Sequence, residues 1–372
     1  MATTTAAKDR MSSRERLLAA YRGLEVDRLP WWAKVCNPTW RTSQPEAVRA
    51  MDDRALLDAI AADGIFGGGG GVTARRPRVR AEDVLRDHER TTVTHTPDGD
   101  LVERWREDPA TRSWHPVEFP VKTREDLKRF AWCYEGVTFD ADETPLAAAR
   151  RRKAEIGERG VLLTACGTSP MMHLVEHVIG PVNVHLMLAD FRDEMEALMD
   201  RMNAVHLEHA RQIARHSPAD IVSSVENTST TLISPAQFER YCYGHLCNVG
   251  RAVEAEGKMH ELHMCGHTKA LLEKIDTIPA ASIEAFTSPT LGNTRLADGR
   301  TRAPSKCLVG GTNCMIWLRP VEEIQRYIEG ELAACRDHRR IVLTTAGVAP
   351  PACPVESFRR IGEWIRTVPV RL

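Results

Sequence analysis

His263 and Cys265 stand two residues apart in the stretch 261–268, and Gly266 follows them at once. Alternate residues of a β-strand point to the same face, so the sequence predicts an imidazole and a thiol projecting side by side from a strand end. Imidazole nitrogen and cysteine thiolate are preferred zinc ligands in proteins. The pair would supply half of a tetrahedral zinc site, and the remaining ligands must come from other elements.

Other polar residues also follow predicted strands. Glu226 and Asn227 come directly after a strand predicted over 220–225, and Cys314 follows one predicted over 306–310. We expect Glu226 to bind metal or accept a proton, Asn227 to orient the substrate, and Cys314 to bind metal or to be a buried thiol. His267, just past the glycine, is either a substrate contact or a loop residue.

The elements that must position these residues alternate regularly after residue 158. Apolar strands are predicted over 161–166, 220–225, 258–265, 281–286, 306–310 and 340–345, with helical segments between them. Such alternation is typical of parallel βαβ units, and about eight strands over the whole chain predict a (β/α)8 TIM barrel. Active sites of these barrels form at the carboxyl ends of the strands, where the polar residues above are predicted to lie.

The predicted organisation is a single barrel domain over 13–372, preceded by a disordered tail over 1–12. Alternating residues over 72–121, with a turn at 96–100, predict a β-hairpin excursion on one side of the barrel. The glycine run 67–71 lacks the spacing of a phosphate-binding loop and is interpreted as a flexible loop or a close backbone approach. Four histidines at helical spacing, at 173, 177, 206 and 209, are interpreted as structural, with a second metal site as the alternative.

Composition narrows the class of protein. The 372 residues are 42% hydrophobic and 27% charged, with a net charge of −1, which argues against a nucleic-acid or anionic-membrane partner. No run of 18 apolar residues predicts a membrane span, and the first residues do not form a secretory signal. Ten scattered cysteines fit free thiols in a reducing cytoplasm, so a cytoplasmic location is expected.

Several motifs along the chain carry a family resemblance. They are Asp27-Arg28-Leu29-Pro30, Thr96-Pro97-Asp98-Gly99, Leu232-Ile233-Ser234-Pro235, His263-Met264-Cys265-Gly266 and Gly310-Gly311-Thr312-Asn313. With these, the chain resembles the uroporphyrinogen decarboxylase superfamily, and within it the zinc-dependent corrinoid methyltransferases. The resemblance implies a cobalamin-linked methyltransferase that moves a methyl group between a small molecule and a corrinoid.

Two departures from the family pattern bear on function. The paired arginines that hold a tetrapyrrole in the decarboxylases are absent from 32–40, which argues against that substrate. The methyltransferases carry a further zinc-binding cysteine at the last strand end, where this chain has Gly347, so Cys314 or Cys353 would have to replace it. The chain also lacks a DxHxxG corrinoid-binding signature, so the corrinoid must be free or held by a separate carrier protein.

Two other classes of protein stay open. One is a lyase that decarboxylates a smaller acid without a metal, and the other is a non-catalytic partner that binds a corrinoid or its carrier. The sequence does not identify the methyl donor, the acceptor or the direction of transfer. It also leaves the oligomeric state open, with a homodimer among the alternatives.

Overall fold

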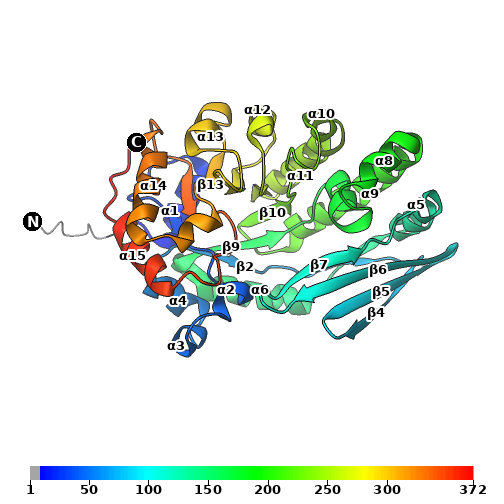
Figure 1. The fold of residues 1–372 in the computed structure, drawn as a ribbon, viewed down its shortest axis with the longest axis horizontal. Helices are drawn as coiled ribbons and strands as arrows, with labels where there is room; N and C mark the ends of the chain where they lie inside the picture. The colour runs from blue at the N-terminus through cyan, green and yellow to red at the C-terminus, as the bar shows by residue number, and fades with distance from the viewer. Residues whose placement is uncertain (1–8, 372) are drawn as a thin grey trace, which may run out of the picture.

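Eight parallel strands form the central sheet of the protein, which a computed structural model describes over residues 9–371. Their spatial order is β1, β14, β13, β12, β11, β10, β9, β2. The two end strands approach each other, because the backbone N–H of Asp63 donates to the carbonyl of Trp31 at 2.6 Å. The sheet is therefore nearly closed into a barrel (Figure 1). The strands are β1 (Trp31–Trp32), β2 (Gly64–Gly67), β9 (Gly160–Ala165), β10 (Ile221–Val225), β11 (Met259–His263), β12 (Ser282–Phe286), β13 (Cys307–Gly310) and β14 (Ile341–Thr344).

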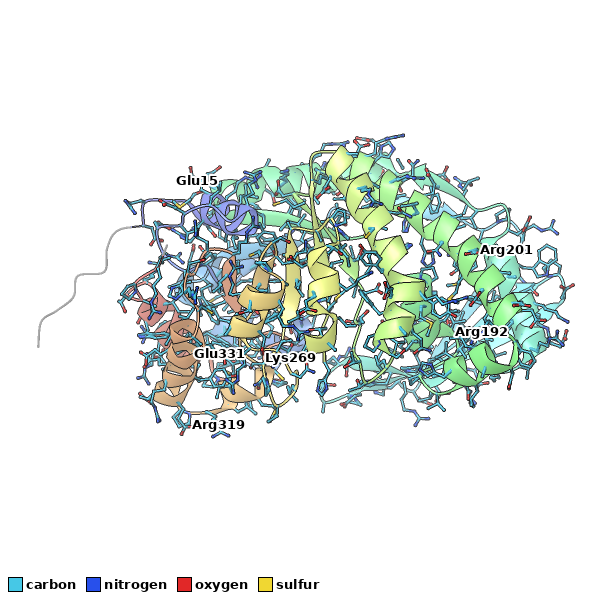
Figure 2. All side chains as sticks on the ribbon, turned by 90° about the horizontal axis from the view of Figure 1, so that it is seen from above. Glu15, Arg192, Arg201, Lys269, Arg319 and Glu331 are labelled. Atoms are coloured by element: carbon cyan, nitrogen blue, oxygen red, sulfur yellow. The ribbon has the colours of Figure 1, made fainter. Side chains whose placement is uncertain are left out.

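Helices surround the strands, as the TIM-barrel prediction requires. Figure 2 shows charged side chains on the outer surface of these helices, including Arg192 and Arg201 on the longest one. The α-helices are α1 (Ser13–Arg22), α2 (Pro38–Arg41), α3 (Glu46–Arg49), α4 (Asp53–Ala59), α5 (Arg124–Ala131), α6 (Glu143–Ile156), α7 (Pro170–His173), α8 (Asn183–Asp190), α9 (Arg192–His216), α10 (Pro235–Gln237), α11 (Gly244–Ala255), α12 (Leu272–Asp276), α13 (Leu296–Arg302), α14 (Val321–Ala333) and α15 (Val355–Ile365).

Shorter helical turns complete the connections. Two of them are π-helical, η3 (Leu174–Val178) and η4 (Phe238–Tyr243), and such turns are often found at functional sites. The others are 3₁₀ turns, η1 (Trp132–Tyr134), η2 (Gly157–Arg159), η5 (Lys269–Leu271) and η6 (Cys314–Leu318). Within the described residues, no helix is both long and apolar enough to cross a lipid bilayer.

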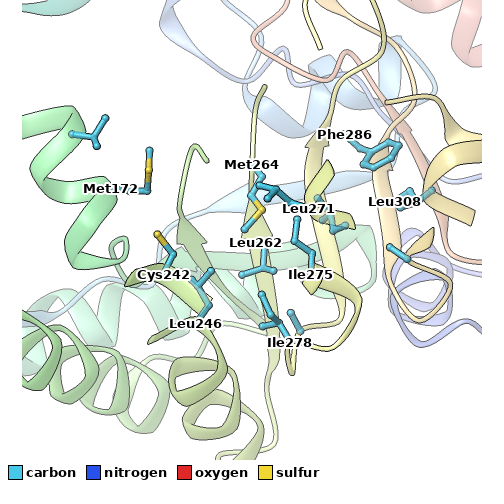
Figure 3. Packing of buried hydrophobic residues seen from close by; sticks show 14 of the residues in the cluster. Met172, Cys242, Leu246, Leu262, Met264, Leu271, Ile275, Ile278, Phe286 and Leu308 are labelled. Carbon is cyan, nitrogen blue, oxygen red and sulfur yellow. The ribbon is translucent and has the colours of Figure 1, made fainter. Parts of the chain in front are cut away.

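The core between strands and helices fixes the direction of the site residues. Leu262 and Met264 are buried and lie close to Ile275 of α12 and the neighbouring Ile278 (Figure 3). Burial of one such side chain stabilises the fold by about 1.5–3 kcal/mol. Because side chains alternate along a strand, packing Leu262 against the helices turns His263 toward the barrel interior.

The first motif of the chain stabilises the amino-terminal end of the barrel. Arg28 donates to the buried carboxylate of Asp63 at 2.8 Å, and Arg16 of α1 donates to Asp27 at 2.7 Å. Asp9 also pairs with Arg28 at 3.1 Å, and Ser12 caps α1. The disordered tail was predicted over 1–12. Its residues 1–8 lie outside the described residues, but residues 9–12 are ordered, because they belong to this ion-pair network and helix cap.

The excursion over 72–121 is larger than the single hairpin predicted. It contains a four-stranded antiparallel sheet of β4 (Arg80–Arg86), β5 (Glu89–Thr96), β6 (Gly99–Asp108) and β7 (Ser113–Glu118), which projects beside α5 in Figure 1. The predicted turn joins β5 to β6. A separate pair, β3 (Val72–Arg75) with β8 (Thr138–Ala141), flanks the barrel.

The glycine run before β3 is a close backbone approach, one of its two predicted interpretations. Gly69 and Gly71 have φ of +87° and +142°, and an added Cβ on Gly71 would lie 2.6 Å from Leu146 of α6. A larger side chain at either position would force the loop away from the barrel.

Candidate active site

The carboxyl ends of the barrel strands carry unusual backbone geometry. Four non-glycine residues at or near these ends have left-handed conformations: Lys34 after β1 (φ 51°), Asn227 after β10 (φ 47°), Ala285 in a bulge of β12 (φ 58°) and Ala346 after β14 (φ 51°). Such conformations cost about 1–3 kcal/mol each and are concentrated at functional sites. The geometry therefore marks the same barrel edge that the strand-end polar residues predict.

His263 at the end of β11 is held by a carboxylate on the next strand. The register of β11 and β12 places His263 opposite Glu284, and Nδ1 of the ring contacts Oε2 of that carboxylate. The other carboxylate oxygen, Oε1, accepts from Nζ of Lys34 at 2.6 Å. Although burial opposes the charged form of His263, hydrogen bonding to Cys265 and Glu284 raises its pKa to about 10. Although burial opposes its charged form, the positive charges of Lys34 and His263 lower the pKa of Glu284.

Cys265 lies just past β11. The strand was predicted over 258–265, but it ends at His263, two residues before the thiol. Its side chain is exposed, and its Sγ donates to Oδ1 of Asn227 at 3.2 Å. The amide Nδ2 of Asn227 donates in turn to Oε2 of Glu176 in η3 at 2.8 Å. One amide thus connects the thiol at the barrel mouth to a carboxyl group on a neighbouring helical turn.

Glu226 has no exposed surface in this structure. Its carboxylate accepts from Oγ1 of Thr168 at 2.9 Å and from the backbone N–H of Ser169 at 2.7 Å, with a further bond from the Ser169 hydroxyl. Burial raises the pKa of Glu226, although these hydrogen bonds favour the charged form. The contacts hold the loop after β9 against the end of β10, and the predicted role in metal binding or proton transfer stays a prediction.

His267 and Cys353 differ in their exposure to solvent. The backbone of His267 contacts the loop after β10, where its N–H donates to Oγ of Ser229 at 3.1 Å, and its side chain is half-buried. Cys353 is completely buried in the core, and its carbonyl accepts from the indole of Trp40 at 2.8 Å. A substrate could therefore reach the side chain of His267 but not that of Cys353.

Cys314 lies beside the strand end at which the resemblance places a further cysteine. A Cβ built on Gly347 would be 3.8 Å from the Cβ of Cys314, which is ordinary van der Waals contact. The Cys314 thiol is half-buried at the start of η6. It therefore stands close to where a side chain on residue 347 would begin.

The carboxyl edge of the barrel carries some, but not all, of the ligands that a zinc site needs. Within residues 9–371, no three His, Cys, Asp or Glu side chains are grouped so that they could hold a metal ion. His263 and Cys265 nevertheless have the donor chemistry of zinc. The contact of Nδ1 with Glu284 also resembles the carboxylate contacts that orient metal-binding histidines. The residues thus fit two positions of a zinc site, and a third ligand is not in place.

Three residues of this constellation were not predicted: Lys34, Glu284 and Glu176. Glu284 lies on a predicted strand, at 281–286, but only the register of β11 against β12 shows that it faces His263. Lys34 follows β1, and Glu176 lies between two histidines that we interpreted as structural. A polar residue in an otherwise apolar strand, as at Glu284, was the available signal.

Comparison with known proteins agrees with the fold. Residues 117–368 match the uroporphyrinogen decarboxylase (URO-D) family. The structure is similar to a methyltransferase from Methanosarcina mazei, with a TM-score of 0.62 and 15% sequence identity over 96% of this chain and 99% of that one. At that identity, the similarity shows a shared fold. The chain matches none of the curated proteins at a significant level.

Proposed function

Since the chain belongs to the uroporphyrinogen decarboxylase family, we propose that it is a methyltransferase that moves a methyl group between a small molecule and a corrinoid. The observation that carries this proposal is the meeting of an imidazole and an exposed thiol, His263 and Cys265, at the carboxyl edge of the barrel. The shared fold with a Methanosarcina methyltransferase supports the reaction class.

Zinc is part of the proposal. His263 and Cys265 would hold it, and Cys314 is the proposed third ligand because it lies next to the position of the family's missing cysteine. A bound zinc would act as a Lewis acid and would keep a thiol ionised at neutral pH. Glu284 and Lys34 would fix the imidazole ring through Nδ1, and Asn227 would orient the Cys265 side chain.

The corrinoid would be a co-substrate and not a resident group. The absence of a DxHxxG signature from the sequence means that cobalamin would be taken from solution or from a separate carrier protein. The open carboxyl edge of the barrel is the expected place of contact, since active sites of these barrels lie there.

One observation favours a metal-free lyase as a second candidate. Hydrogen bonding raises the pKa of His263, which favours its protonated form at neutral pH, and Lys34 supplies a second cation on the other oxygen of the same Glu284 carboxylate. Such a pair could bind the carboxylate of a small acid and protonate the carbanion that remains after loss of carbon dioxide. This reaction needs neither zinc nor a corrinoid.

A cobalamin assay separates the two candidates. The protein, with and without added zinc, is mixed with methylcobalamin and a panel of thiols, or with reduced cobalamin and a panel of methyl donors, and the cobalamin absorbance is followed. The proposal predicts a zinc-dependent spectral change that is lost in Cys265→Ser and kept in His115→Ala, a control on the exposed face of β7. Decarboxylation of small acids with no cobalamin reaction would support the lyase.

A further inference from the structure

A cavity lies beside the barrel mouth, on the far side of Asn227 from Cys265. Its volume is about 410 Å³, and four histidines line it, two from α7 and η3 and two from α9. The ring centroids of His173 lie 5.4 Å from those of both His177 and His206, and Phe139 of β8 stacks on His209 at 5.1 Å. The histidines predicted to be structural therefore form one aromatic-walled cavity.

The imidazoles contribute aromatic surface and hydrogen bonds but little charge. Burial lowers the pKa of His206 to about 4 and also lowers the pKa values of His173 and His209. These rings are neutral at physiological pH. The charges in the cavity wall come from two other lining residues, Arg76 and Glu176.

Arg76 brings a guanidinium group without an acidic partner among the described residues. It donates to the carbonyl of Cys133, and its guanidinium lies 5.0 Å from the ring centroid of Tyr134. No carboxylate among residues 9–371 lies within ion-pair distance of it. A half-buried guanidinium has five N–H donors, so donors remain for a ligand.

Glu176 brings a carboxyl group that is only half satisfied. Oε2 accepts from Asn227 at 2.8 Å, whereas Oε1 is buried with no hydrogen-bond partner among the described residues. No lysine or arginine in that part of the chain pairs with it. Nε2 of His177 lies 3.9 Å from Oε2, but burial lowers the pKa of that ring, and burial raises the pKa of Glu176 to about 7. A buried acceptor without a partner costs about 1–3 kcal/mol, so such an atom calls for a ligand.

We propose that the cavity binds a small zwitterion, with its carboxylate on Arg76 and its ammonium or sulfonium group on Glu176. The ligand would supply each side chain with the opposite charge that it lacks. Aromatic faces around a carboxylate suit methylated onium groups, and the volume suits a small molecule. This inference rests on the proposed function, because it places a methyl-bearing onium group near Cys265, two hydrogen bonds away through Glu176 and Asn227.

Three ligands of similar shape test the charge requirement by isothermal titration calorimetry, without cobalamin. Glycine betaine carries both charges, 3,3-dimethylbutanoate replaces the ammonium nitrogen with carbon, and choline replaces the carboxylate with an alcohol. The proposal predicts that betaine binds at least tenfold more tightly than either analogue. Glu176→Gln should remove the preference over dimethylbutanoate, and Arg76→Gln the preference over choline.

Matched variants keep the test interpretable if a substitution disturbs the fold. Arg75→Gln changes the neighbouring exposed arginine, which pairs with Asp140, and should leave all three affinities unchanged. Equal affinities for betaine and its analogues, or unchanged preferences in Glu176→Gln, would overturn the zwitterion site. Betaine binding with these preferences, but no methyl transfer to cobalamin from any donor of the panel, would support the site and contradict the proposed function. Methyl transfer to cobalamin from uncharged donors alone would support the proposed function and contradict the zwitterion site.

Discussion

Asn227 donates from Nδ2 to Oε2 of Glu176 at 2.8 Å, while its Oδ1 accepts from the thiol of Cys265. This amide connects the candidate reaction centre on β11 to the histidine-lined cavity beside it. Its backbone adopts a left-handed conformation, with φ of 47°, which asparagine and glycine tolerate better than other residues. Both the side chain and the backbone of this position therefore have structural roles.

Asn227→Ala and Asn227→Gly separate these two roles. Alanine in the left-handed conformation should destabilise the protein by about 1–2 kcal/mol, and glycine by less, which urea unfolding would measure. Both variants lose the amide contacts, so both should lose methyl-transfer activity by about tenfold or more. Wild-type activity in a folded Asn227→Gly variant would show that the amide has no functional role.

Glu284→Gln tests the buried ion pair behind His263. The carboxylate is almost completely buried and pairs with Lys34, so its loss leaves a poorly solvated ammonium group without a counter-charge. We expect a loss of about 3 kcal/mol in the free energy of unfolding. The control is Glu239→Gln, which breaks an exposed pair with Lys274 and should cost less than about 1 kcal/mol. Equal costs for the two variants would contradict this account of the pair.

Asp220 should make stability depend on pH in the acid range. Although burial opposes its charged form, hydrogen bonds from Arg14 and Lys153 lower its pKa from 3.8 to about 2. Because the folded pKa lies below the ordinary value, this contribution is complete above about pH 4–5 and is lost as the pH falls toward 2.

Asp220→Asn should consequently destabilise the protein most at pH 7, and the difference from wild type should shrink below pH 4. Unfolding by urea at pH 7, 4 and 3 measures it. Asp200→Asn, an exposed residue of α9 with no ion pair in the described chain, should change stability little at every pH. A destabilisation by Asp220→Asn that stays constant with pH would contradict the linkage.

Gly347→Cys should strengthen zinc binding. Among residues 9–371, a Cβ at this position meets only Cys314, at 3.8 Å, so the new side chain fits without displacing backbone. Under reducing conditions, we expect the dissociation constant for zinc to fall by about tenfold or more, or about 1.4 kcal/mol. Competition with a zinc chelator measures it, and Gly330→Cys in α14 is the control. An unchanged affinity would show that residue 347 is not next to a metal site.

The sequence predicted the barrel well because short apolar strands and amphipathic helices are local patterns. The strand predicted over 220–225 is β10 (Ile221–Val225), and the strand predicted over 306–310 is β13 (Cys307–Gly310). The excursion was underestimated for a local reason too. The turn between β4 and β5 has positive φ at Asp87 and His88 and contains no glycine, so no residue marked it.

The site was less predictable because its contacts depend on register and on helical connections. Nothing near His263 in the sequence indicates that Glu284 lies opposite it, since parallel strands are paired across an intervening helix. The histidines showed only helical spacing, and their shared cavity follows from the packing of α9 against α7. The structure added Lys34, Glu284 and Glu176 to the predicted site residues.

The zinc content of the purified protein tests the central claim most directly. Elemental analysis of protein prepared without chelator should give about one zinc per chain in the wild type and in His115→Ala. His263→Ala and Cys265→Ser should each lose it. No zinc in wild-type protein, even after zinc is added back, would contradict the metal-dependent methyltransferase and favour the metal-free lyase.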